Sequence, residues 1–410
     1  MMNEERQPKQ YDAVLGGNNP PPVNGLVLGG IAGVERRLNS SDIKTKIAAV
    51  TDALDYGGDG IDLVIDALSD SSEEFQIAAA KVLKQQGNVD AKQALLNYNP
   101  HLFVTTLKDW NQIRFNPEVG IKNQIDNAYI LNLEVIERRL GRRQRGVSIN
   151  HNLDVINSLL QQPQISQIEA LICNIEWDYW NEHKQFGFFL EAICDAKDKL
   201  SSLRALFIGD REEHQFRKSK IDIFDITPIL KAYPNLEVLK VRGRFSEYPL
   251  ECEGFRHEHL KTLIIETADL SEHNLTQILN LDLPALEYLE IWLGRQISYY
   301  PDDNSHIRKM LANLLKDDSF PNLKYLGLKS SEPADIIAEE ITNSSLLARL
   351  AILDLSMGCL TDRGYSLLKN HLKAEKLYAL RIDIGGAYYD YEGETSFIQD
   401  EGDRYYALYE

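Results

Sequence analysis

Histidines are the first residues of this 410-residue sequence to test for chemistry, because two of the nine stand close together. His257 and His259 flank Glu258, and on a strand both imidazoles would lie on one face, as a two-ligand metal site requires. The sequence places no third ligand beside them and has no H-E-x-x-H motif. A surface loop explains the pair better, and we expect no metal.

Glycines in "LVLGGIAGVERR" follow an apolar run and precede a helical pattern, which is the order that a phosphate-binding loop needs. However, Gly29, Gly30 and Gly33 match neither G-x-G-x-x-G nor a P-loop with its Lys and Ser/Thr. A turn that lets two helices pack closely is the better interpretation. We therefore expect no bound cofactor.

Nucleophiles and carboxylate pairs give no catalytic pattern. There is no G-x-S-x-G elbow, and 62 acidic residues provide accidental carboxylate pairs anywhere. The four cysteines stand far apart without a C-x-x-C pair, which argues against a disulfide framework or a zinc knuckle and favours a reducing cytoplasm: Cys173, Cys194, Cys252 and Cys359. We expect no catalytic residue.

The balance of charge limits the partners. A formal net charge of −18 repels phosphate backbones, so nucleic-acid binding is disfavoured. One exception is "ERRLGRRQRG", which has five arginines from Arg138 to Arg145. A solvated helix end is the favoured interpretation, and a nucleic-acid or anionic-ligand site is the alternative. No apolar run is long enough to span a membrane, and the first residues fit neither a secretory signal nor a transit peptide.

The elements that must position any site come from a repeat. The pattern L-x-x-L-x-(L/I/V) begins at Ile168, Leu203, Leu236, Leu260, Leu286, Leu323, Leu350 and Leu377, with offsets of 35, 33, 24, 26, 37, 27 and 27 residues. Intervals of about 20 to 29 residues are the leucine-rich-repeat period, and the longer ones fit the same unit with an insertion. Helical patterns opened by Ser, Asn, Thr or Asp lie between the strands. The usual asparagine is missing from its slot, which predicts an irregular arc.

The N-terminal quarter follows a different pattern, with apolar residues at helical spacing between glycine pairs and Ser/Asp caps. The predicted fold class is therefore α/β, a leucine-rich-repeat solenoid with parallel strands on its concave face, plus an all-α HEAT-like module. We expect these parts: a lead-in (1–24), the HEAT-like module (25–100), a connector (101–150), the leucine-rich-repeat domain (151–387) and an acidic tail (388–410).

Two resemblances add to this prediction. The segment "LVIDALSDSSEEFQIAAAKVLKQQGNVDAKQALLNY" resembles HEAT-like repeats of the phycobilisome-lyase type, found ahead of repeat arrays in cyanobacterial proteins. From about residue 165 to the end, stretches such as "DLPALEYLEIWLG" and "LAILDLSMGCLTDRGYSLL" resemble a bacterial family of cytoplasmic leucine-rich-repeat proteins. That family has no assigned biochemical function, so the resemblance implies fold and compartment only.

The candidate binding surface is the concave wall. Alternation points the third, fifth and seventh motif residues to this wall. Aromatic and arginine residues on such a surface dominate binding energy at protein interfaces. The predicted partner-binding residues are Arg242, Glu266, Tyr288, Glu290, Trp292, Tyr325 and Lys329. Truncating Trp292 or Arg242 should weaken binding with little effect on folding, unless the insertion after Trp292 covers it and the indole simply packs.

The sequence favours a non-enzymatic protein-interaction scaffold in the cytoplasm, with a protein partner. Two alternatives stay open: a tetrapyrrole-related lyase or chaperone acting through the HEAT-like half, and a regulatory or immunity-type binder of one dedicated enzyme.

Overall fold

The computed structural model describes residues 30–86, 89–98, 104–122, 127–133, 149–175, 185–210, 225–243, 249–252, 254–267, 270–294, 305–316, 318–371, 379–384 and 387–392. The chain divides into two units, Met1–Val104 and Thr105–Glu410. The cluster from Arg138 to Arg145 lies outside the described residues, as does most of the expected tail.

The regular elements described in the first unit are all helices. Asp42 caps the second helix by accepting a hydrogen bond from the Thr45 amide, and Lys46 pairs with Asp70 at 2.5 Å. The predicted cap before the fourth helix is present, because the Phe75 amide donates to the Ser72 hydroxyl. The helices are α1 (Gly30–Leu38), α2 (Ile43–Ala53), α3 (Gly57–Asp66), α4 (Glu73–Gln86) and α5 (Val89–Tyr98).

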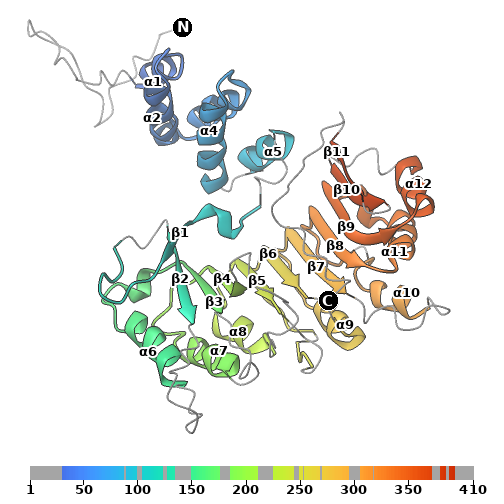
Figure 1. The fold of residues 1–410 in the computed structure, drawn as a ribbon. Coiled ribbons are helices and arrows are strands. Elements are labelled where there is room, and N and C mark those ends of the chain that lie inside the picture. Colours follow the sequence, from blue (N-terminus) through green and yellow to red (C-terminus); the bar gives the residue numbers. More distant parts are fainter. Residues whose placement is uncertain are drawn as a thin grey trace, which may run out of the picture. The chain divides into compact units, whose positions relative to one another are not determined.

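The second unit is an open α/β repeat array (Figure 1). In its described part, 11 strands pair in sequence order: β1 (Asn111–Arg114), β2 (Asn127–Leu133), β3 (Ala170–Ile175), β4 (Ala205–Asp210), β5 (Val238–Arg242), β6 (Thr262–Glu266), β7 (Tyr288–Gly294), β8 (Tyr325–Ser331), β9 (Ile352–Leu360), β10 (Ala379–Ile384) and β11 (Ala387–Glu392). Pairing is parallel from β1 to β10, and β11 returns antiparallel to β10.

Helices cover one face of this sheet, as Figure 1 shows. They are α6 (Ile149–Leu160), α7 (Gln185–Asp195), α8 (Thr227–Ala232), α9 (Glu272–Leu279), α10 (Ser305–Leu311), α11 (Ala334–Thr342) and α12 (Asp362–Asn370). Ser271 and Thr361 cap α9 and α12 through their hydroxyl oxygens, as the sequence predicted. The helices and the motif leucines share one buried core, in which Leu353 is fully buried.

The predicted strand register is confirmed. Each strand from β3 to β10 begins at the third residue of its motif, and these third residues pair with one another across the sheet. The sheet extends further than the eight motif strands, because β1 and β2 come from the expected connector and β11 from residues 387–392. The tyrosine-rich strand β11 thus covers the last edge, as a capping segment does.

Left-handed backbone occurs in the second half of several strands. Gly209, at the end of β4, has φ +87°, and a Cβ there would lie 2.0 Å from the Arg242 carbonyl oxygen of the next strand. Only glycine fits this close approach. Ser330, next to last in β8, and Met357, within β9, also have positive φ. None of the described helices is long and apolar enough to cross a membrane.

Candidate functional site: the concave face of the sheet

The concave face is the helix-free face of the sheet in the second unit (Figure 1). Alternation along each strand sends the leucines under the helices and the third, fifth and seventh motif residues to this face. Because neighbouring strands pair in register, the third residues form a row. From β2 to β9 this row is Ala128, Ala170, Ala205, Val238, Thr262, Tyr288, Tyr325 and Ile352.

A short segment, Thr105–Trp110, lies on the first half of the concave face, and we name it the strap. Leu107 and Trp110 of the strap share one buried cluster with Ala128, Ala170, Ile172, Ala205, Phe207 and Val238. The Thr262 hydroxyl donates a hydrogen bond to the Thr105 carbonyl, which brings the start of the strap to β6. The protein's own chain therefore occupies this face from β2 to β4 and reaches the first residues of β5 and β6, Val238 and Thr262.

The Glu266 cluster consists of Phe207, Lys240, Arg242 and Glu266, on strands β4 to β6. The Lys240 ammonium lies 2.8 Å from one Glu266 oxygen, and the Arg242 Nε donates to the other. Both cations also lie over the Phe207 ring, with the Lys240 nitrogen 4.5 Å and the Arg242 guanidinium carbon 5.5 Å from its centroid. The Glu266 carboxylate thus lies between Lys240 and Arg242, and both cations also contact the Phe207 ring.

Burial and the two cations have opposite effects on Glu266. Burial alone would raise the pKa of this carboxyl, because it penalises the charged form. Lys240 and Arg242 overcome that effect by charge and hydrogen bonding, and they hold the pKa of Glu266 at about 2. Glu266 is therefore ionised at neutral pH although its side chain is only 7% exposed.

The Glu290 cluster occupies strands β7 to β9 and consists of Tyr288, Glu290, Trp292, Tyr325, Lys329 and Asp354. At its centre, Glu290 accepts hydrogen bonds from the Tyr288 hydroxyl at 2.6 Å and the Trp292 indole at 2.8 Å. The Lys329 ammonium lies 3.5 Å from Glu290 and 3.8 Å from Asp354. It also lies 5.6 Å from the Trp292 ring centroid. The carboxylates hold the aromatic side chains in fixed orientations.

Stacked tyrosines complete the Glu290 cluster. The rings of Tyr288 and Tyr325 are parallel, with centroids 3.8 Å apart. The Tyr325 hydroxyl donates to Asp354 at 2.8 Å. Gly327 makes room for this ring, because a Cβ at that position would lie 3.0 Å from Tyr325 and 3.2 Å from Glu290. A residue without a side chain is therefore part of the cluster's construction.

Burial within the Glu290 cluster is uneven. Trp292 and Asp354 are 4% and 2% exposed, whereas Tyr288 and Lys329 are half-buried. Burial raises the pKa of the Tyr288 phenol well above its ordinary value, and the nearby Glu290 charge acts in the same direction. Trp292 faces away from the core leucines, as predicted, but it is packed, so we now expect its truncation to cost stability.

All seven predicted residues lie on the concave face, in two clusters. Arg242 and Glu266 belong to the Glu266 cluster, and the other five belong to the Glu290 cluster. The strap and the role of Gly327 were missed. Alanines in two successive third places, Ala170 and Ala205, were the available signal, because small residues on a face leave room for another segment.

Alternating charges form a second row, one residue before the strands. Arg204 pairs with Glu169 at 3.4 Å and with Glu237 at 2.8 Å, and Lys261 pairs with Glu237 at 2.8 Å. Cross-strand pairs of this kind stabilise neighbouring strands modestly. Arg204 and Lys261 also lower the pKa of the Glu237 carboxyl, although its burial acts in the opposite direction.

The histidine pair serves a turn. His257 is buried; its Nε2 lies 3.0 Å from the Tyr233 carbonyl, and its Nδ1 accepts from the Leu260 amide at 3.1 Å. His259 Nδ1 lies 3.0 Å from the Pro234 carbonyl. Burial lowers the pKa of His257. Within the described residues, no three His, Cys, Asp or Glu side chains gather as a metal site requires. All four cysteines lie in described segments, and no disulfide joins any two of them.

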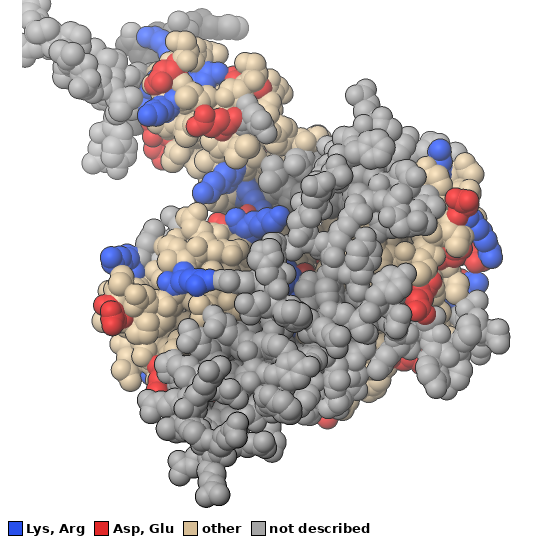
Figure 2. Space-filling model, viewed as in Figure 1, with Lys and Arg blue, Asp and Glu red and all other residues tan. Residues whose placement is uncertain are grey.

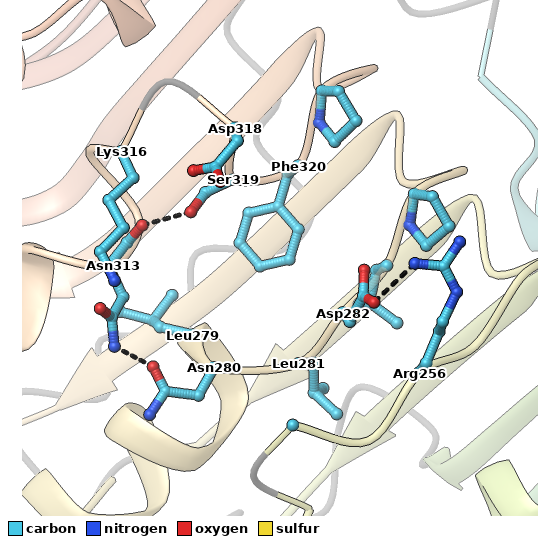
Figure 3. A pocket seen from close by; sticks show the side chains of 14 residues that line it. Arg256, Leu279, Asn280, Leu281, Asp282, Asn313, Lys316, Asp318, Ser319 and Phe320 are labelled. Atoms are coloured by element: carbon cyan, nitrogen blue, oxygen red, sulfur yellow. Dashed lines mark hydrogen bonds and ion pairs between the residues drawn. The ribbon is translucent and has the colours of Figure 1, made fainter.

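A pocket of about 630 Å³ opens among the loops that precede β6, β7 and β8 (Figure 3). Its polar side chains bond to one another: Arg256 lies 2.6 Å from Asp282, and the Asn313 amide donates to Asn280. Phe320 forms part of the wall. Four of the lining side chains are therefore already paired with one another.

The helix-covered side carries interleaved charges. At the right edge of Figure 2, over the region of α11 and α12, Lys/Arg and Asp/Glu groups alternate. Arg308 and Arg363 both lie near Glu339, at 3.4 Å and 3.5 Å. Such exposed pairs contribute little to stability and are typical of a solvated surface.

Comparisons with known proteins are sparse. No protein-family model matches the chain, and no curated protein matches its sequence. A crystal structure of a Bacteroides fragilis protein, determined by a structural genomics consortium, is similar with a TM-score of 0.49 and 26% identity. The similarity covers 56% of this chain and 64% of that one, so it spans less than two thirds of the neighbour's length. At this TM-score the similarity carries no argument about function.

Proposed function

We propose that this chain is a non-enzymatic protein-interaction scaffold in which a leucine-rich-repeat array follows a HEAT-like helical module. The repeat identity is supported by the motif, whose third residue starts every strand from β3 to β10. The helical identity is supported by short neighbouring helices from α1 to α5. A cytoplasmic location is part of this proposal and rests on the sequence.

The proposed interface is the concave face from β5 to β8. One observation carries it: buried carboxylates fix part-exposed side chains there, namely Lys240, Arg242, Tyr288 and Lys329. Lys240 and Arg242 are 20% and 14% exposed, above a Glu266 side chain that is 7% exposed. Side chains that are already ordered lose less entropy on binding, which favours affinity. We expect a protein partner rather than a nucleic acid or a membrane.

The two other functions stay as alternatives without a specific observation in their favour. A tetrapyrrole-related lyase or chaperone would bind a chromophore, which absorbance of the purified protein mixed with bilin would detect. An immunity-type binder would recover one dedicated enzyme in a pull-down, rather than a set of partners.

The test uses a pair of substitutions that spares the fold. Replacing a buried ion pair with apolar residues of similar volume is often neutral for stability. Arg242→Met with Glu266→Met leaves only Lys240 without its partner, on a side chain that is 20% exposed, so it should lower the melting temperature less than Glu266→Gln and should weaken partner binding by about 2 kcal/mol or more. Partners are first recovered from the native host with a tagged chain and then titrated against purified protein.

The matched control is the exposed pair on the helices, Arg363→Met with Glu339→Met, whose arginine is 73% exposed. It should change neither binding nor stability. Equal affinity of the two double variants and the wild type would place the interface off the concave face.

A further inference from the structure

The strap is a self-contained turn. The Thr106 hydroxyl and the Asp109 carboxylate cap each other's backbone, and the Trp110 amide donates to the Leu107 carbonyl within the same turn. Leu107 and Trp110 are buried, whereas Lys108 and Asp109 between them are exposed. The strap thus presents two apolar side chains, three residues apart, from one turn.

The surface beneath the strap is a groove. Ala128, Ala170 and Ala205 form its floor, and Ile172, Phe207 and Val238 belong to the same apolar cluster. These three alanines are fully buried. Small residues on three adjacent strands leave a hollow that larger apolar side chains can fill.

Polar groups around the groove hold the strap by its ends. The Trp110 indole donates to Glu169 at 3.3 Å, and the Arg204 guanidinium carbon lies 5.9 Å from the indole centroid. The Thr262 hydroxyl donates to the Thr105 carbonyl. The groove thus recognises two apolar anchors, one indole N–H and one carbonyl, and any segment that offers these groups could make the same contacts.

We propose that this groove is a docking site for a short amphipathic turn of a partner protein, and that the strap is its intramolecular occupant. The partner turn carries a leucine and a tryptophan three residues apart, with polar residues between them. Its binding displaces the strap. The groove shares the Phe207 ring with the Glu266 cluster but none of the charged groups of either cluster, so this proposal goes beyond the proposed function and can fail independently of it.

Covalent attachment explains how the strap competes. A tethered segment faces its site at an effective concentration of about millimolar, so a free peptide at micromolar concentration should not displace it. Weakening the strap's anchors removes this competition. The groove should then bind the strap sequence when it is added as a separate peptide.

The experiment uses the full chain and a fluorescently labelled peptide with the sequence Val104–Asn111, "VTTLKDWN". The chain variant is Leu107→Ala with Trp110→Ala. Binding to this variant at least tenfold tighter than to wild type supports the proposal. Equal affinity for the two chains, or no binding to either, overturns it. A peptide with alanine at both anchors should not bind, and binding of that peptide as tight as the first also overturns it.

A second measurement needs no disruptive substitution. In the wild-type chain, hydrogen exchange at the hydrogen-bonded Asp109 and Trp110 amides should be at least tenfold faster than at Leu206 in β4, because the strap opens alone. Thr262→Val, which removes only the bond to the Thr105 carbonyl, should speed the strap amides further. Equal exchange of strap and strand amides in both chains would overturn the proposal.

Discussion

The two halves of the concave face are built on one repeat and differ in the size of its third residue. At β3 and β4 the third residues are alanines, Ala128 of β2 continues their row, and the strap lies over all three. At β7 and β8 they are Tyr288 and Tyr325, whose rings stack on each other. The leucine core behind both halves is continuous.

This difference shows how one repeat can support two kinds of surface. Small third residues leave space that another segment must fill. Large third residues fill the space themselves, and carboxylates at neighbouring positions, Glu290 and Asp354, then fix their polar ends. We expect the strap to detach from the alanine surface while the sheet stays folded. We expect the tyrosine surface to be lost only when the sheet itself unfolds.

The largest expected effect comes from comparing two tryptophans. Trp292→Ala should cost about 3 to 5 kcal/mol of unfolding free energy, because the indole is buried within the sheet cluster. Trp110→Ala should cost at most about 2 kcal/mol, since the strap can leave its groove while the sheet stays folded. Denaturant unfolding of both variants measures the two values. Equal costs would mean that the strap unfolds with the sheet and would remove the distinction.

Glu266→Gln tests the border between the halves. At neutral pH it should cost about 1.5 to 3 kcal/mol, because two cations lose their charged partner. The native pKa of about 2 lies below the ordinary 4.5. Stability from this carboxylate is therefore complete above pH 4.5 and is lost as the pH falls toward 2.

The readout is the difference in unfolding free energy between wild type and Glu266→Gln, measured at several pH values. It should be constant above pH 4.5 and shrink below it. A difference that grows as the pH falls would contradict the ionised state assigned to Glu266.

Gly327→Ala tests whether the tyrosine ring needs its space. The added methyl group would press on Tyr325 and Glu290, so we expect a loss of about 1 to 3 kcal/mol. Gly58→Ala in α3 is the matched control, because a Cβ there meets nothing within 4 Å. It should be neutral or slightly stabilising. Thermal melts compare the stability of the two variants. Equal melting temperatures for Gly327→Ala and Gly58→Ala would contradict a steric role for Gly327.

Much of the second unit's frame could be predicted from sequence. The motif leucines fixed the strand register, because a shift of one residue would expose every leucine. That register also put Arg242, Trp292 and Lys329 on the concave face. The repeat period could not predict strands β1 and β2, because neither Asn111–Arg114 nor Asn127–Leu133 carries the leucine motif.

The contacts across the concave face could not be predicted. Thr262 donates a hydrogen bond to the Thr105 carbonyl of the strap. These two residues are far apart in the sequence, and no local pattern predicts that they interact. Burial of Trp292 depends on the side chains that surround it rather than on its own position in the repeat. In the sequence, Gly327 is an ordinary fifth residue of its motif. Only the position of the Tyr325 ring explains why this residue has no side chain.

The central claim is that the concave face from β5 to β8 is the interface. Hydrogen exchange of the chain with and without its recovered partner tests it most directly. The account predicts slower exchange on binding in β5, β6, β7 and β8, with no change in α11 and α12. Protection of those two helices, or of α1 to α5 alone, with unchanged exchange in the four strands would contradict it.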